Sequence, residues 1–313
     1  MKEKILWAGL MLVILSWVGN YLYFESKQLE RPIFLDHYYE AYMHDQEQLT
    51  FYYLTNKMDN YEVRSLSIDG VKLYPVSDHG FTMWRTAPNT PQFEQEFSHQ
   101  YLKSVTVELP KKSIPIEDGS KDRWSFEEVN ATFSNGQSYT LDLGKVNVYE
   151  KVTDYTVLNT HASSSSNQHT SEKSMLATKP ITVEDINVPF PENLSEDVYV
   201  KVDVNQEKFN INQDENTPEW LKREKQNEMV GISIDEDIFP FHLNKNDRMQ
   251  LSMQFNPYRK SYFEFSIKIS GTSDEGEQFK SKAPIIDHPS LNQQDINEII
   301  EEKQGGNVNE ASN

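Results

Sequence analysis

The stretch Asp197-Val-Tyr-Val-Lys-Val-Asp-Val204 places a valine at every second position. Successive side chains of a β-strand point to opposite faces, so this alternation predicts a strand with one apolar face. Similar alternation occurs on both sides of this stretch, at Val105–Leu109, Met249–Phe255 and Phe263–Ile269. The sequence therefore predicts a mainly β protein.

Two β-hairpins are predicted from the residues between alternating segments. Asn135-Gly136 separates Val129–Phe133 from Tyr139–Leu143, and Asn-Gly favours the positive φ angles of a tight hairpin turn. A second hairpin is expected from Phe263–Ile269 through the turn at 271–276 to Phe279. Because both hairpins close their segments in a similar way, we expect two small antiparallel β-sandwich-like domains.

An uncharged, mostly apolar segment, Ile5–Phe24, lies near the N-terminus. At 1.5 Å per residue a helix of this length spans about 30 Å, the thickness of a bilayer core. The bulky residues of Ser16–Tyr21 do not suit signal-peptide cleavage, so we expect a retained transmembrane signal anchor. Lys2 and Lys4 favour a cytoplasmic N-terminus, which predicts a single-pass cell-membrane protein with extracytoplasmic C-terminal domains. The lipid bilayer is then the first predicted partner.

Composition narrows the function further. The net charge of −19 disfavours binding to nucleic acid. The absence of cysteine excludes disulfides, a thiol nucleophile and a zinc–thiolate site. A cysteine-free exported protein is typical of a bacterial envelope, and more of Gram-positive than of animal cell surfaces.

A serine-rich tract from His161 to Ser174 has no apolar residue larger than alanine and predicts a flexible linker, with a long loop inside one domain as the alternative. The predicted organisation has five parts, and their boundaries follow from the anchor, this tract and the last helical pattern. They are the anchor (1–31), a first extracytoplasmic β domain (32–160), the linker (161–178), a second β domain (179–289), and an amphipathic helix with a disordered acidic tail (290–313).

The final helical pattern starts with a possible capping box, Ser290 to Gln293. Ile296, Ile299 and Ile300 then share one helical face. An isolated helix of this length is marginally stable in water, so the isoleucine stripe needs a surface to cover. Two readings remain open: the helix docks on its own domain, or it binds a membrane or cell-envelope protein.

His37, Glu40 and His44 form the most metal-like set in the sequence. On a helix these side chains would lie close together, and two imidazoles with one carboxylate suit zinc. The local pattern leaves helix and strand equally open, and we therefore assign no metal, cofactor or catalytic residue.

Recognisable catalytic motifs, such as a nucleophile elbow, a phosphate-binding glycine loop or HExxH, do not occur. We therefore expect no enzymatic activity. The predicted protein is membrane-anchored and extracytoplasmic, and it acts as a non-catalytic binding or assembly module at a bacterial envelope, more specifically a Gram-positive one. The alternatives are an envelope hydrolase or wall-polymer-binding protein, with or without a metal, and a sensor that signals through its membrane helix.

Overall fold

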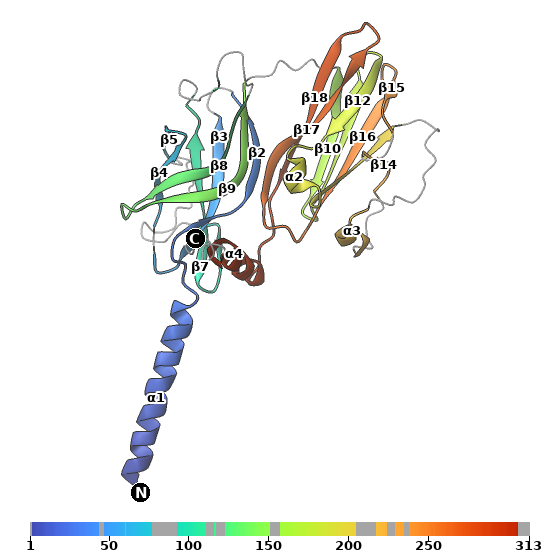
Figure 1. Cartoon of the computed structure of the whole chain (residues 1–313). Coiled ribbons are helices and arrows are strands. Elements are labelled where there is room, and N and C mark those ends of the chain that lie inside the picture. The colour runs from blue at the N-terminus through green and yellow to red at the C-terminus, as the bar shows by residue number, and fades with distance from the viewer. Residues whose placement is uncertain are drawn as a thin grey trace, which may run out of the picture.

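A computed structural model shows a mainly β protein with several sheets. The structure describes residues 2–43, 47–59, 61–76, 93–110, 116, 123–150, 157–204, 217–223, 229–234 and 238–305. Two β lobes lie side by side and a single helix projects from the first of them (Figure 1). We call residues 29–149 with 291–305 the first lobe, and residues 157–287 the second lobe.

The projecting helix, α1, runs from Lys2 to Glu25. Its described large apolar side chains between Leu6 and Leu22 are exposed. Among the described residues, which leave out the side chains at positions 2, 3, 5 and 8, no helix is found that is long and apolar enough to cross a membrane.

A four-stranded sheet of the described residues belongs wholly to the first lobe. Its strands, in spatial order, are β1 (Ile33–Phe34), β3 (Gln48–Asn56), β7 (Gln100–Glu108) and β6 (Gln95–Glu96).

A nine-stranded sheet runs through both lobes and joins them. Its strands, in spatial order, are β15 (Phe241–Leu243), β12 (Ile181–Asn187), β17 (Tyr262–Ser273), β2 (His37–Tyr42), β9 (Ser138–Tyr149), β8 (Arg123–Phe133), β4 (Val63–Ile68) and β5 (Val71–Leu73), with β18 (Gln278–Asp287) paired to β17. Strand β2 is parallel to both of its neighbours, β17 and β9, whereas the other described pairings are antiparallel.

A five-stranded sheet completes the second lobe. Its strands, in spatial order, are β10 (Leu158–Ser166), β11 (Thr170–Ala177), β16 (Arg248–Phe255), β13 (Val198–Val204) and β14 (Ile232–Ser233). The remaining described helices are α2 (Pro191–Leu194), α3 (Glu219–Arg223) and α4 (Gln293–Gly305).

Each lobe has its own hydrophobic core. The first core contains Phe34, Phe51 and Phe133, and the second contains Met249, Phe255 and Phe263. The alternating valines of β13 point into the second core, because Val198, Val200, Val202 and Val204 are all buried, which confirms the strand and its apolar face. The division into sequential β domains at 32–160 and 179–289 stays a prediction, although the shared sheet and the return of α4 to the first lobe tie the two parts together.

Both predicted hairpins are confirmed. Strands β8 and β9 pair from Thr132 with Ser138, around a turn in which Gly136 has φ of +85°. Strands β17 and β18 pair from Thr272 with Gln278. A positive φ is accessible to glycine at little cost, which explains why the Asn-Gly dipeptide marks the first turn.

The serine-rich tract differs from its prediction as a linker. Most of the residues 161–178 lie in the hairpin of β10 and β11, in which Ser166 pairs with Thr170. The reason is backbone pairing: β11 is held on its other side by β16 and buries Met175 and Ala177 in the second core, so β10 is ordered by its hydrogen bonds to β11.

Helix α4 was predicted correctly in its position but not in its cap. The side chain of Asn292 accepts hydrogen bonds from the N–H groups of Gln294 and Asp295, at 2.7 and 3.2 Å. The Asp295 carboxylate in turn accepts from the N–H of Asn292, at 2.7 Å. The capping box is therefore Asn292–Asp295, two residues after the pair Ser290–Gln293 suggested by the sequence.

Candidate functional site

The two described members of the metal-like set, His37 and Glu40, do not come together. His37 and Glu40 lie on strand β2 and not on a helix, and His44 is outside the described residues. Residues 37 and 40 are three apart on a strand, so their side chains leave opposite faces of the sheet. Across the part of the chain that the structure describes, no group of three or more histidine, aspartate and glutamate side chains could hold a metal ion.

His37 is a fully buried structural histidine. Its Nε2 accepts a hydrogen bond from the N–H of Tyr52 at 2.9 Å, so the proton of the neutral ring is on Nδ1, which lies 3.2 Å from the carbonyl oxygen of Leu143. Burial lowers the pKa of His37 to about 3. The ring is therefore neutral at physiological pH and links three chain segments of the first lobe.

Glu40 links the two lobes at the point where strands β2 and β17 of the shared sheet stop pairing. Strands β2 and β17 pair only from Tyr262 with His37 to Glu264 with Tyr39. Beyond that point Glu40 accepts hydrogen bonds from the N–H of Ser266 at 3.2 Å and from Lys268 Nζ at 2.6 Å. Its carboxylate, which is fully buried, thus replaces the missing main-chain pairing between the lobes.

Aromatic rings reinforce this junction on the other face of the sheet. Tyr52 of β3 stacks on Tyr262 of β17 with ring centroids 4.1 Å apart and an interplanar angle of 9°. His288, which follows β18, contacts both rings, at 5.5 and 5.1 Å. Groups from both lobes therefore share one aromatic cluster, which fixes their relative position.

Helix α4 contacts the first lobe, although it follows the last strand of the second (Figure 1). Ile296 and Ile299 are buried, with exposed fractions of 0% and 3%, and Ile300 packs against the same core. The helix therefore docks on its own chain, but on the first lobe and not on the β domain that precedes it in the sequence. The core of the first lobe covers Ile296 and Ile299, whereas Ile300 is partly exposed, and binding of a partner through this stripe stays a prediction.

Ion pairs hold α4 to both lobes. Lys303 Nζ contacts the carboxylates of Asp36 at 2.5 Å and Asp142 at 2.9 Å in the first lobe. Glu298 pairs with Lys260 Nζ of the β16–β17 loop at 2.7 Å. The helix thus adds a third set of contacts between the lobes, besides Glu40 and the aromatic cluster.

The chain that leaves α1 is bound directly to the first lobe. Gln100 donates a hydrogen bond to the carbonyl of Lys27 at 2.7 Å. The Asn56 side chain pairs with both the N–H and the carbonyl of Leu29, at 2.7 and 3.0 Å. Phe24 at the end of α1 contacts the ring of His99, with centroids 5.9 Å apart. The lobe is therefore attached to the helix without a free spacer.

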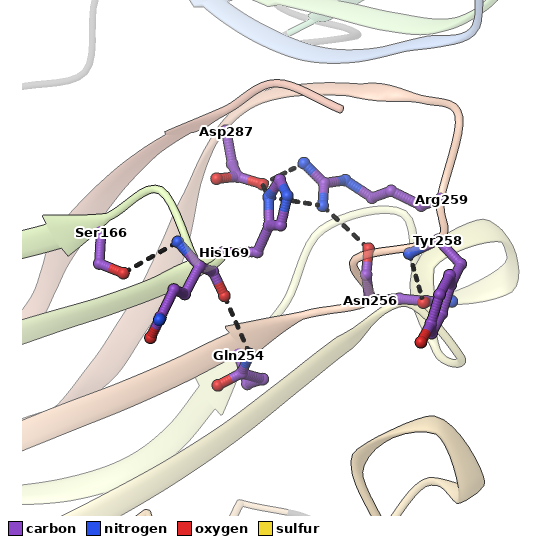
Figure 2. Close-up of polar contacts among 8 residues, drawn as sticks. Ser166, His169, Gln254, Asn256, Tyr258, Arg259 and Asp287 are labelled. Atoms are coloured by element: carbon purple, nitrogen blue, oxygen red, sulfur yellow. Dashed lines mark hydrogen bonds and ion pairs between the residues drawn. The ribbon is translucent and has the colours of Figure 1, made fainter. Parts of the chain in front are cut away.

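A buried polar cluster joins the β10–β11 turn to the end of β18 (Figure 2). His169 Nδ1 lies 2.9 Å from the Asp287 carboxylate, which also pairs with Arg259. The Arg259 guanidinium also donates to the carbonyl of Asn256 at 3.0 Å and lies 4.5 Å from the ring centroid of Phe263. Burial lowers the pKa of Arg259, while the charge of Asp287 opposes this effect.

Ser166 is close to this cluster, but the three residues do not form a serine–histidine–aspartate triad. The Ser166 hydroxyl accepts a hydrogen bond from the N–H of Gln168 at 3.0 Å, and its carbonyl accepts from the N–H of His169 at 3.2 Å. These are turn contacts, since His169 adopts φ of +58° in this turn. The cluster therefore orders the turn and holds the two sheets of the second lobe together.

The edge strands of the sheets differ in length and in whether they carry residues that hinder pairing with another strand. Among the described strands, β1, β5, β6, β14 and β15 are edges of only two or three residues. The long edge strand β18 carries Lys280, Lys282 and Pro284, which hinder pairing with another strand. Strand β10 is a long edge without any of these residues, and its residues 159–166 are all exposed. The sequence does not reveal this edge, because a serine-rich tract is also typical of a flexible linker.

Two described pockets lie on the first lobe. One, of about 390 Å³, is lined by Tyr53, Glu62, Glu94 and Lys103, among others. Lys103 is almost fully buried there, and burial lowers its pKa. A second pocket, of about 380 Å³, lies beside α4 and includes Arg31.

No family model and no curated protein matches the chain.

Proposed function

We propose that this protein is a non-catalytic binding or assembly module held at the outer face of a bacterial membrane by α1, with its N-terminus in the cytoplasm. Residues 5–24 are uncharged in the complete sequence. The described large side chains of this helix from Leu6 to Leu22 are exposed on all sides, which is unfavourable in water and favourable in lipid. Lys2 and Lys4 support the orientation.

The observation that carries the assembly role is the direct attachment of the first lobe to the end of α1. The contacts of Asn56 with Leu29, and of Gln100 with Lys27, leave no free spacer between helix and lobe. Glu40 and α4 then hold the second lobe at a set position relative to the first. A protein that presents surfaces to neighbours at a constant height and orientation benefits from such attachment, whereas a tethered enzyme does not need it.

The membrane part of the proposal is tested by cysteine labelling, because the natural chain has no cysteine. Lys4→Cys is expected to resist a membrane-impermeant maleimide in intact cells, and Asn159→Cys is expected to react. As a control, Ile14→Lys places a charge in the middle of the apolar segment, which costs about 3 kcal/mol and should weaken retention in washed membranes. Equal labelling at both cysteines, or unchanged retention of Ile14→Lys, would contradict the anchor.

The binding part is tested by crosslinking the native protein in its membrane, followed by mass spectrometry of what stays attached. Recovery of one membrane or envelope protein at a constant ratio supports the module. The alternative of a wall-polymer hydrolase needs converging carboxylates, and two described pockets carry some: Glu62 and Glu94 line the 390 Å³ pocket, and Glu128 and Asp142 are among the residues that line the 380 Å³ pocket. Release of fragments from purified wall polymer, abolished by Glu62→Gln or Glu128→Gln but not by Glu192→Gln at an exposed position of helix α2, would support that alternative and contradict the module.

A further inference from the structure

We propose that the outer edge of β10 is a strand-addition site, which takes an extended, uncharged or basic segment of another protein. This inference rests on the proposed function only because it assumes a binding module. It adds the surface that binds and the chemical character of the bound segment. Strand addition uses the unpaired N–H and C=O groups of an exposed edge as hydrogen-bonding partners.

The first argument is the contrast between the two long edges. Strand β18 carries Lys280, Lys282 and Pro284, the residue types that prevent edge-to-edge pairing. Strand β10, which is of comparable length, has none of them. Of the two long edges that the structure describes in the second lobe, one thus carries protective residues and the other does not.

The second argument is the regularity of the open edge. The pairing of β10 with β11 shifts once, between Thr160 and Ala162, and then continues without interruption from Ala162 to Ser166. This run is ordered by β11, and the His169–Asp287 contact holds the turn at its end. A preordered edge loses little conformational entropy when a segment pairs with it.

The third argument defines what binds. Residues 159–166 carry no charge apart from any on His161, in a chain of net charge −19. A neutral or basic segment therefore approaches without repulsion, whereas an acidic segment or a second copy of the acidic chain is disfavoured. Because Ala162 and the serines are small, they leave room for valine, threonine or aromatic side chains opposite them. Recognition comes from the main chain and should tolerate different sequences.

The test uses the full chain in mild detergent and a short fluorescent peptide of alternating valine and threonine with lysine at both ends. We expect saturable binding by fluorescence anisotropy, with slower hydrogen exchange at the amides of residues 162–166. A matched peptide with proline at two central positions should bind at least about tenfold more weakly, because proline removes main-chain donors.

Matched variants locate the site. Ser164→Lys adds a protective charge to the exposed edge of β10 and should weaken binding about tenfold, whereas Gln278→Lys adds the same charge to exposed β18 and should change it less than twofold. Thermal unfolding shows that each variant is folded. Absence of binding, equal effects of the two lysines, or equal binding of the proline peptide would overturn the proposal. The assay needs no membrane, so its failure is distinct from failure of the anchor.

Discussion

Lowering the pH from 7.5 to 5 is expected to destabilise the protein through His37. In the folded state burial lowers the pKa of this ring to about 3, whereas in the unfolded chain it titrates near 6.5. Between these values the unfolded state binds the extra proton, so stability falls as the pH falls. At pH 5, which is 1.5 units below the unfolded pKa, the loss is about 2 kcal/mol at 1.36 kcal/mol per unit.

The assay is urea unfolding of the full chain in detergent at several pH values, compared with His37→Gln. Glutamine does not titrate and offers an acceptor to the Tyr52 N–H, although we expect it to cost about 1–3 kcal/mol at pH 7.5. Other groups titrate equally in both proteins, so the difference between the two stability curves isolates His37.

The wild-type protein should lose about 2 kcal/mol more than the variant between pH 7.5 and 5. Parallel curves would refute the reasoning that His37 stays buried and neutral. Imidazole nitrogen shifts measured by NMR provide a second check, because the hydrogen bonds require the proton on Nδ1 down to pH 5.

Substitutions at three further positions test the junction between the lobes, the docking of α4 and the close approach of β9 to β2. Glu40→Ala should lower the free energy of unfolding by about 2–3 kcal/mol, because alanine leaves the N–H of Ser266 on β17 without an acceptor. Glu40→Gln should lower it by only about 1 kcal/mol, because glutamine keeps an acceptor and the lysine partner is partly exposed to water. Urea unfolding distinguishes the two variants. Ile299→Ala should cost about 2–4 kcal/mol, and limited proteolysis should then release α4 first. Gly144→Ala should cost about 3 kcal/mol or more, since its φ is +87° and a Cβ would lie 2.7 Å from the backbone of β2. The control, Gly136→Ala, also has a positive φ but open space around it, and should cost only about 1 kcal/mol in thermal unfolding.

The parts of the fold that depend on local pattern could be predicted from the sequence. The valines of Val198–Val204 and the Asn135-Gly136 turn report on neighbours only a few residues away, and both predictions are confirmed. The serine tract could not be identified as a strand, because its order comes from hydrogen bonds to β11 and its own side chains bury almost nothing.

The candidate site could not be predicted because it depends on distant contacts. Glu40 meets Ser266 and Lys268 across more than two hundred residues of chain, and no periodicity records such a pairing. The stripe of Ile296 and Ile299 indicates that α4 covers a surface, yet it does not identify the first lobe as that surface. The short segment around His37 fits both a helical and a strand pattern, so the metal-like spacing was ambiguous.

The docking of α4 also affects the order of events during synthesis. Strand β9 ends at Tyr149, yet the core of the first lobe includes Leu291, Ile296 and Ile299. At about 5–20 residues per second, a ribosome needs roughly 7–30 s to make the intervening chain. During that interval the nascent first lobe exposes apolar surface that α4 will later cover. A chain truncated before residue 291 should therefore keep this surface exposed.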